Sequence, residues 1–474
     1  MRTKKRYVIF LLAAVVILAL PSLWTAIAGG SSWDAETSDL ADPPSLYRED
    51  GSVNTALLSD AGAYFEDHFA LRPALISTNS AVLASLFETS VVSEVTAGKD
   101  GWLYYSGDLP DLQKTNRLTD REIWNIAHNL SLVKEYYDLL GIRFVVTIAP
   151  NKSTLYPEQL PAYVVPVEGE SNADRVAAAL TGAGIPYADL FAAFEAEEDC
   201  LYLKEDSHWN NLGAALAEKT ITEVAERTDA IDFTEAAYTW EAVHSGDLAE
   251  LVYPNAVTPE EDAVFDTEQH WQYTSDTQDN MDSYITTENP ERTGSLYLFR
   301  DSFGASLVPL CAEEYGSCVF SRYTPYKISD PVVAGVDTVV LEKVERKLSE
   351  LCTEAPLMQN PVRSVTVTGE TDSESACNLT ENGGFLVLYG AVDEALFDDT
   401  SEIYLEVTDP ASKETAVYEA FYLMGQDKEG NTYDSTYQVN LLKPEGGSGR
   451  LDIRLLTGHS GEVTAVGSYS LEYE

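Results

Sequence analysis

One serine of this chain lies where a nucleophile could act. Ser302 belongs to the segment Leu298-Phe-Arg-Asp-Ser-Phe-Gly304, in which an apolar strand gives way to a helix. At such a turn the hydroxyl projects above the carboxyl edge of a parallel sheet, where ligands bind, and the first helix amides can stabilise developing negative charge. The alternative is that Asp301 or Ser302 only caps the helix, as Asp and Ser often do.

A serine hydroxyl is a weak nucleophile until a base takes its proton. His208 is the candidate base, because imidazole transfers protons near neutral pH. Asp206 precedes it by two residues and could orient the ring. The chain has only 6 His, so an Asp-x-His segment beside a serine turn is informative. We expect ordinary surface or core positions for the following four: His68, His128, His270 and His459.

Four further side chains are candidates for substrate binding at the same edge. Lys152 follows a buried strand, Arg322 and Tyr323 follow the next strand along the edge, and Trp209 follows His208 directly. Structural ion pairs are an equal alternative for Lys152 and Arg322, and core packing is the alternative for Trp209.

The cysteines give no sign of a metal. No two of them have the C-x-x-C spacing of zinc sites, and the sequence predicts neither a metal nor a cofactor. Cys311 and Cys318 are the nearest pair, and they either form a disulfide or remain buried thiols.

Strands and helices alternate in the segment that contains these residues. Thr119-Asp-Arg-Glu122 predicts a capping box that opens a helix, and Gly141 predicts its end. Arg143-Phe-Val-Val-Thr-Ile-Ala149 is a continuous apolar strand of the kind buried on both faces. This alternation predicts an α/β fold, a parallel sheet with helices on both faces. Further helices are expected within residues 57–87, 173–180 and 305–314, and further strands at 185–187, 296–299 and 338–341.

The last part of the chain has a different pattern. From residue 361 to residue 474, short runs of alternating hydrophobicity are separated by Gly, Asp and Pro, with no useful helical periodicity. This pattern predicts a separate all-β sandwich. It could bind polysaccharide through exposed aromatic residues, or serve as a spacer or packing unit.

The first 28 residues predict export. A basic start, Arg2 to Arg6, precedes an uncharged run from Tyr7 to Ala28, which is long enough to cross a bilayer as a helix. Ala26-Ile-Ala28 also resembles a signal-peptide cleavage site, so the run is either a retained membrane anchor or a removed signal. We expect a stalk over residues 29–56, a catalytic domain over 57–360, and an extracellular location for both.

The charge of the chain restricts its partners. With 30 Lys and Arg against 78 Asp and Glu, the formal net charge is −48. Nucleic acid is excluded as a partner, because phosphate binding needs clustered cations. Hydrophobic residues make up 45% of the chain, which is enough to bury a core and argues against global disorder.

At these motifs the chain resembles the DHHW family, which is related to the periplasmic alginate O-acetyltransferases of the SGNH-hydrolase superfamily. The resemblance covers roughly residues 60–350 and includes the order Asp, His, Ser of the alginate-type group. Only one histidine occurs in the D-x-H-W motif here. The landmarks are Tyr64–Arg72, Gly98–Tyr104, Ala149–Lys152, Tyr156–Glu158, Asp206–Trp209, Gly246–Leu248, Arg300–Phe303, Val339–Glu342 and Glu345–Arg346.

The resemblance implies the roles of three residues: Ser302 as nucleophile, His208 as base and Asp206 as the carboxylate that orients it. It implies an exported O-acetyltransferase that acts on a cell-surface or secreted polysaccharide through an acyl-serine. A membrane-bound O-acyltransferase is the implied acetyl supplier. The alternatives are an esterase that removes acetyl groups with the same triad, and a non-catalytic glycan-binding protein of the envelope.

Overall fold

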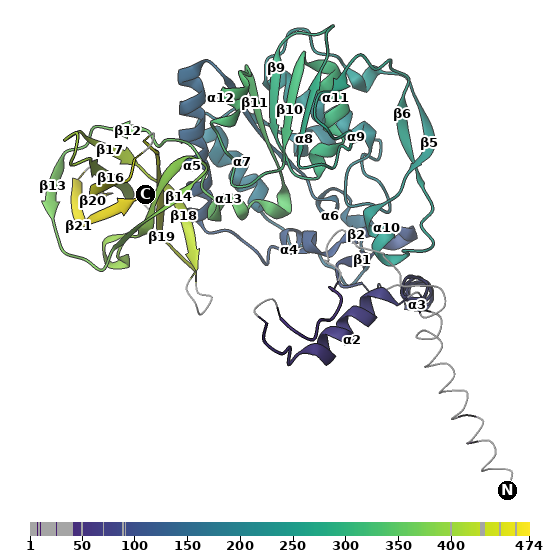
Figure 1. Ribbon diagram of the computed structural model, residues 1–474. Coiled ribbons are helices and arrows are strands. Elements are labelled where there is room, and N and C mark those ends of the chain that lie inside the picture. The colour runs from purple at the N-terminus through teal and green to yellow at the C-terminus, as the bar shows by residue number, and fades with distance from the viewer. Residues whose placement is uncertain are drawn as a thin grey trace.

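In the computed structural model the chain forms an α/β unit followed by a β-rich unit (Figure 1). Apart from Tyr7, Phe10 and Thr25, the structure describes residues 41–48, 51–69, 71–87, 90, 92–398, 401–426, 432–444, 447–459 and 462–474. The predicted membrane segment and most of the predicted stalk lie outside these residues. Within them, no helix combines the length and apolar character that crossing a bilayer requires.

A seven-stranded sheet forms the centre of the α/β unit. Its central strands β3, β11, β9 and β10 are parallel to one another, so their carboxyl ends meet at one edge. The strand order is β4 (Tyr187–Ala188), β3 (Arg143–Ala149), β11 (Thr338–Val344), β9 (Ser295–Phe299), β10 (Ser317–Ser321), β8 (Tyr284–Glu288) and β7 (Gln272–Tyr273).

The two strands at the far edge differ from the predicted parallel arrangement. β8 pairs antiparallel with β10, and β7 pairs antiparallel with β8. Only residues 289–294 connect β8 to β9, and a parallel connection needs a crossover of about a dozen residues or more. β8 therefore runs opposite to β9 and pairs on the far side of β10.

Helices cover both faces of the sheet, as the alternation predicted. In β3, Phe144, Val146 and Ile148 pack with one layer of helices, whereas Val145 and Ala149 pack with the other. This double burial accounts for the continuous apolar run of the strand. The first layer contains α5 (Asp120–Leu140), α7 (Asn172–Gly182) and α13 (Glu350–Thr353), and the second contains α8 (Leu190–Glu195), α9 (Asn211–Val224) and α11 (Leu307–Glu314).

The signals that delimit α5 act as predicted. The Thr119 side chain accepts a hydrogen bond from Glu122 N at 3.1 Å, and the Glu122 carboxylate accepts one from Thr119 N at 2.6 Å. Gly141 ends the helix with a φ of 72°, a left-handed conformation that glycine adopts without strain.

Smaller elements lie beside the carboxyl edge. The predicted helices are α2 (Leu57–His68) and α3 (Arg72–Phe87), followed by the hairpin β1 (Val95–Ala97) and β2 (Leu103–Tyr105). A second antiparallel ribbon was not predicted. It consists of β5 (Tyr238–His244) and β6 (Glu260–Phe265), drawn at the right of Figure 1, with α10 (Asp247–Val252) between them in sequence.

The C-terminal part consists of two sheets that share one core, which fits the predicted sheet-rich region. Leu388 and Val439 of one sheet pack with Leu405 and Ile453 of the other. The first sheet has the order β14 (Ala376–Asn382), β15 (Phe385–Ala391), β19 (Thr432–Leu442) and β18 (Phe421–Gln426). The second has the order β12 (Val362–Arg363), β17 (Thr415–Glu419), β16 (Glu402–Thr408), β20 (Gly449–His459), β21 (Glu462–Tyr473) and β13 (Val367–Glu370).

This sandwich docks on α5. The buried guanidinium of Arg121 donates to Ser401 O and lies 4.4 Å from the ring centroid of Trp124 and 4.9 Å from that of Tyr422. The buried Asn129 side chain donates to Tyr422 O at 2.8 Å and accepts from Tyr422 N at 2.9 Å. The side chain thus satisfies a buried donor and a buried acceptor of β18, and ties the two units together.

The cysteines form no disulfide among the described residues. Cys311 and Cys318, the pair that could have bridged, are both buried thiols. Cys318 Sγ instead donates to Cys311 O at 3.3 Å.

Replacing Asn129 with alanine should lower the free energy of unfolding by about 2–4 kcal/mol, because two buried backbone groups of Tyr422 lose their partners. Denaturant unfolding measures this loss. The matched control is Ser131→Ala on the same helix. The Ser131 hydroxyl donates to His128 O, one turn earlier, and its loss should change the free energy of unfolding by about 0.5 kcal/mol or less. Equal stability of both variants would contradict the role given to Asn129.

Candidate active site

Asp301, rather than Ser302, holds the turn that follows β9. Asp301 Oδ1 accepts from Phe303 N at 3.0 Å, and Asp301 Oδ2 accepts from Val344 N at 2.8 Å. Ser302 makes no side-chain capping bond. Of the two alternatives left open by the sequence, capping therefore falls to Asp301, and the Ser302 hydroxyl remains available at the carboxyl edge of the sheet.

A second carboxyl group lies beneath this turn. Glu342 of β11 is fully buried and accepts from Asp301 N at 2.9 Å. Burial and the neighbouring Asp301 charge raise the pKa of Glu342 well above its usual value, which favours its neutral form. The pair connects β9 and β11 directly below Ser302.

The three residues predicted to act together are brought together by the fold. His208 Nε2 lies 2.9 Å from Ser302 Oγ, and His208 Nδ1 lies 2.7 Å from Asp206 Oδ1. Asp206 Oδ1 also accepts from the backbone N of His208 at 2.8 Å. This is the hydrogen-bond order required for an imidazole to take a proton from a serine while a carboxylate fixes its tautomer.

The charges around His208 and Asp206 suit a role of His208 as a general base. Burial alone would lower the pKa of His208, but the Asp206 carboxylate, assisted by Asp247, raises it above the usual value. Burial alone would raise the pKa of Asp206, but His208 and His244 together lower it well below the usual value. Asp206 therefore stays ionised and stabilises the cation that forms when His208 takes a proton.

Two residues of this network had no catalytic role in the sequence analysis. His244 Nε2 lies 2.8 Å from Asp206 Oδ2, which also accepts from Asp247 N at 2.9 Å. The Asp247 carboxylate accepts from Ser207 N at 2.8 Å and from Ser207 Oγ at 2.6 Å, which fixes the loop before His208. His244 lies far from His208 in sequence, and its only local signal is its place two residues before Gly246-Asp247.

The loop that carries Asp206 and His208 is held from two sides. On the ribbon side, the Glu260 carboxylate accepts from Lys204 N at 2.7 Å and from Glu205 N at 3.1 Å. Gly246 packs so closely against this loop that a Cβ there would lie 2.3 Å from Glu205 O. A larger residue at Gly246 would therefore displace the loop that carries Asp206 and His208.

Lys152 holds the loop from the other side. Its side chain is fully buried, and Nζ donates to Leu103 O at 2.7 Å, Lys204 O at 2.8 Å and Asp206 O at 2.8 Å. Burial lowers the pKa of Lys152 to about 8, although Asp206 and other acidic groups oppose this effect. With all three donors used inside the protein, Lys152 is positioned to support the loop and not to contact substrate.

The other predicted binding residues differ in accessibility. Trp209 is 1% exposed, donates from Nε1 to Ser306 Oγ at 2.6 Å, and packs edge-on against Phe303, so its position is that of a core residue. Arg322 donates from Nη1 to Met281 O at 2.8 Å. Tyr323 is 60% exposed and stacks on the ring of Tyr284. Of the four predicted residues, Tyr323 is therefore the one that offers an open aromatic face.

Among the described residues, Asp206, His208 and Asp247 form a group that could hold a metal ion, because one ligand atom of each lies within 4.8 Å of the others. Their atoms are already engaged by Ser302, His244 and Ser207. Such a set of hydrogen bonds fits proton transfer better than ion coordination.

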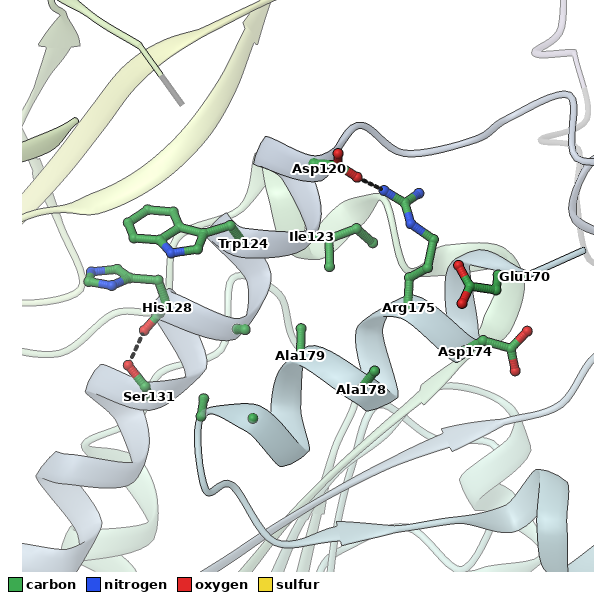
Figure 2. A pocket seen from close by; sticks show the side chains of 13 residues that line it. Asp120, Ile123, Trp124, His128, Ser131, Glu170, Asp174, Arg175, Ala178 and Ala179 are labelled. Atoms are coloured by element: carbon green, nitrogen blue, oxygen red, sulfur yellow. Dashed lines mark hydrogen bonds and ion pairs between the residues drawn. The ribbon is translucent and has the colours of Figure 1, made fainter. Parts of the chain in front are cut away.

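A separate hollow of about 630 Å³ lies between α5 and α7 (Figure 2). Trp124 stands on one wall, and the Asp120–Arg175 ion pair of 2.7 Å closes another. It shares no lining residue with the candidate active site.

Comparisons with known proteins agree with the motifs. The family model of an SGNH hydrolase-like domain, acetyltransferase AlgX, matches residues 95–293. The probable alginate O-acetylase AlgJ of Pseudomonas aeruginosa is 26% identical over 160 residues, which cover 32% of this chain and 40% of that protein. The probable alginate O-acetylase AlgJ of Pseudomonas syringae pv. tomato is 27% identical over 162 residues, which cover 33% of this chain and 39% of that protein. The chain thus matches less than half the length of these relatives.

Among solved structures, a DHHW family protein from Eubacterium siraeum is similar with a TM-score of 0.40 and 18% identity, covering 55% of this chain and 93% of that one. PatB1 of Bacillus cereus is similar with a TM-score of 0.41 and 15% identity, and the match covers 54% of this chain and 96% of that one. The resemblance recognised from the motifs, to the SGNH hydrolase-like alginate acetylase group, is confirmed by the family model and the two curated relatives.

Lys152→Met should lower the free energy of unfolding by about 3 kcal/mol or more, because three backbone carbonyl groups, two of them in buried contacts, lose their donor. Any reaction that this site catalyses should show a lower kcat, because the Asp206 loop loosens, while KM stays unchanged. Thermal unfolding and steady-state kinetics together measure this. Lys99→Met is the matched control, since the exposed Lys99 donates only to Glu158 O, at 2.6 Å. A raised KM with unaltered stability would instead make Lys152 a substrate contact.

Proposed function

We propose that this chain, which is similar over residues 95–293 to an SGNH hydrolase-like acetyltransferase domain, is an O-acetyltransferase whose acyl carrier is Ser302. The observation that carries the proposal is the 2.9 Å contact between His208 Nε2 and Ser302 Oγ, backed by the 2.7 Å contact between His208 Nδ1 and Asp206. The acceptor is a hydroxyl group of a cell-surface or secreted polysaccharide, by analogy with the alginate acetylases.

In the first half-reaction, His208 takes the proton of the Ser302 hydroxyl as Ser302 Oγ attacks the acetyl carbonyl of the donor. The backbone N–H of Ser302 is the proposed donor to the oxyanion. As the tetrahedral intermediate collapses, the bond to the donor's leaving group breaks and His208 returns the proton to that group. The product is acetyl-Ser302, with Asp206 stabilising the imidazolium throughout.

The second half-reaction reverses these roles with a new nucleophile. A sugar hydroxyl gives its proton to His208 and attacks the acetyl carbonyl, and the Ser302 Oγ–carbon bond breaks. His208 then protonates Ser302 Oγ, so that the enzyme is restored and the sugar leaves as its acetyl ester. The exposed Tyr323–Tyr284 pair lies where β10 ends and β8 begins, one strand along from β9, and is a suitable surface for a sugar ring.

Export belongs to the same proposal. The uncharged run from Tyr7 to Ala28 would anchor the chain in the cell membrane, or be removed, with the catalytic unit outside. Acetyl groups would then have to cross the membrane, which is the task proposed for a membrane-bound O-acyltransferase partner.

An esterase is the nearest second candidate, because water and a sugar hydroxyl compete for the same acyl-serine. The distinguishing experiment supplies the full-length protein with an activated acetyl ester, with and without neutral oligosaccharides. Acetylated sugar is expected. Release of acetate alone, at the same rate with and without acceptor, would favour the esterase.

Ser302→Ala should abolish both transfer and hydrolysis, and His208→Ala should lower the rate by about 10²–10⁴-fold, because the general base is lost. Both rates are measured with the activated acetyl ester. Ser349→Ala, an exposed serine that makes no cap bond, is the control and should retain full activity. Undiminished turnover in Ser302→Ala would end the proposal, and an inactive wild-type protein would favour a non-catalytic glycan-binding role.

A further inference from the structure

A second histidine shares the carboxylate of the candidate site. His244 is the last residue of β5, and its Nε2 lies 2.8 Å from Asp206 Oδ2. A β-bulge between Ala242 and His244 shifts the register at this point of the ribbon. Bulges commonly redirect a side chain next to an active site. The register shift thus lies directly beside His244, the one residue of this strand that is not exposed and the one that contacts Asp206.

The two oxygens of Asp206 have separate partners. Oδ1 serves His208, through its backbone N and its Nδ1, whereas Oδ2 serves His244 Nε2 and Asp247 N. The carboxylate is 4% exposed, so its negative charge depends on these four contacts for stabilisation. The His208 end of this network leads to Ser302, and the His244 end, 36% exposed, leads to solvent.

We propose that His244 is a positioning residue of the acetyl-transfer site, which orients Asp206 and shares its negative charge, so that His208 holds a proton less tightly than it would beside Asp206 alone. This inference rests on the proposed function, because it assigns to His208 the role of base.

The direction of the effect follows from the charges that face His244. These are Asp206 on the loop that carries His208, and Glu260 and Asp262 on β6. Burial alone would lower the pKa of His244, but the bond to Asp206 and the acidic neighbours raise it above its usual value. His244 is therefore cationic as the pH falls, and this positive charge opposes protonation of His208 across the shared carboxylate.

A merely structural role for His244 makes a different prediction. The ribbon has its own anchors, since Glu260 accepts from Lys204 N and Glu205 N, and Asp262 Oδ1 accepts from Asn211 N at 2.9 Å. Loss of His244 therefore leaves the ribbon attached to the loop. An effect on His208 would come from the shared carboxylate and not from detachment of the ribbon.

Two substitutions separate the orientation of Asp206 by His244 from the effect of the charge of His244. His244→Gln keeps a neutral donor near Asp206 Oδ2, and His244→Phe keeps the ring volume without a donor. With His244→Gln, the acid limb of kcat/KM should move to higher pH, while the plateau rate stays within a few-fold of wild type. With His244→Phe, the acid limb should move likewise and the plateau should fall by about 10–100-fold, because a hydrogen bond to a charged group is lost.

His270→Gln is the matched control. His270 is also bonded to a carboxylate, Glu313, at 2.7 Å, and its side chain is 35% exposed against 36% for His244. Its pH profile should coincide with that of the wild type. Profiles of both His244 variants that coincide with the wild type would overturn the proposal, as would a plateau loss in His244→Phe without any shift of the acid limb.

A second measurement, the titration of His208, does not depend on catalytic activity. Imidazole ¹⁵N titration of the full-length protein should give a higher pKa for His208 in His244→Gln than in the wild type. An unchanged His208 titration would overturn the coupling even if the enzyme is active. A shifted titration in a protein that transfers no acetyl group would retain the coupling and reject the proposed function.

Discussion

A carboxylate buried in a protein is costly unless hydrogen bonds and opposite charges replace its water, and Asp206 is placed under that constraint. Its two oxygens make four contacts, which come from the loop that carries Asp206 and His208, the β5–β6 ribbon and α10. Lys152 adds a fifth link through the backbone carbonyl of the same residue. The elements outside the sheet are thus arranged around one negative charge, and the position of His208 follows from it.

The sheet supplies the other half of the site. Parallel strands β9 and β11 end at the same edge, and the Asp301–Glu342 contact joins them just below the point where Ser302 emerges. Because Asp301 takes over the capping of the turn, the hydroxyl of Ser302 has no structural duty. The turn on the sheet and the clamped loop beside it therefore bring the Ser302 hydroxyl and the His208 imidazole together.

Local signals predicted the parts of the fold that depend on local physics. The capping box at Thr119, the stop at Gly141 and the two-sided burial of β3 can each be predicted from a few residues. The antiparallel course of β8 and the ribbon with His244 could not, since strand pairing depends on contacts between distant segments. Lys152 shows the same limit: a lysine after a strand suggests a ligand contact, and only the folded chain reveals three carbonyl groups around it.

The central claim is that Ser302 carries the acetyl group between donor and acceptor. The most direct measurement mixes the protein with an activated acetyl ester, quenches it in acid within the first turnover, and maps the modified residue by peptide mass spectrometry. The account predicts one acetyl group on Ser302, which disappears when an oligosaccharide is added before the quench and reappears on the sugar. An acetyl group on another residue, or turnover with unmodified Ser302, would contradict it.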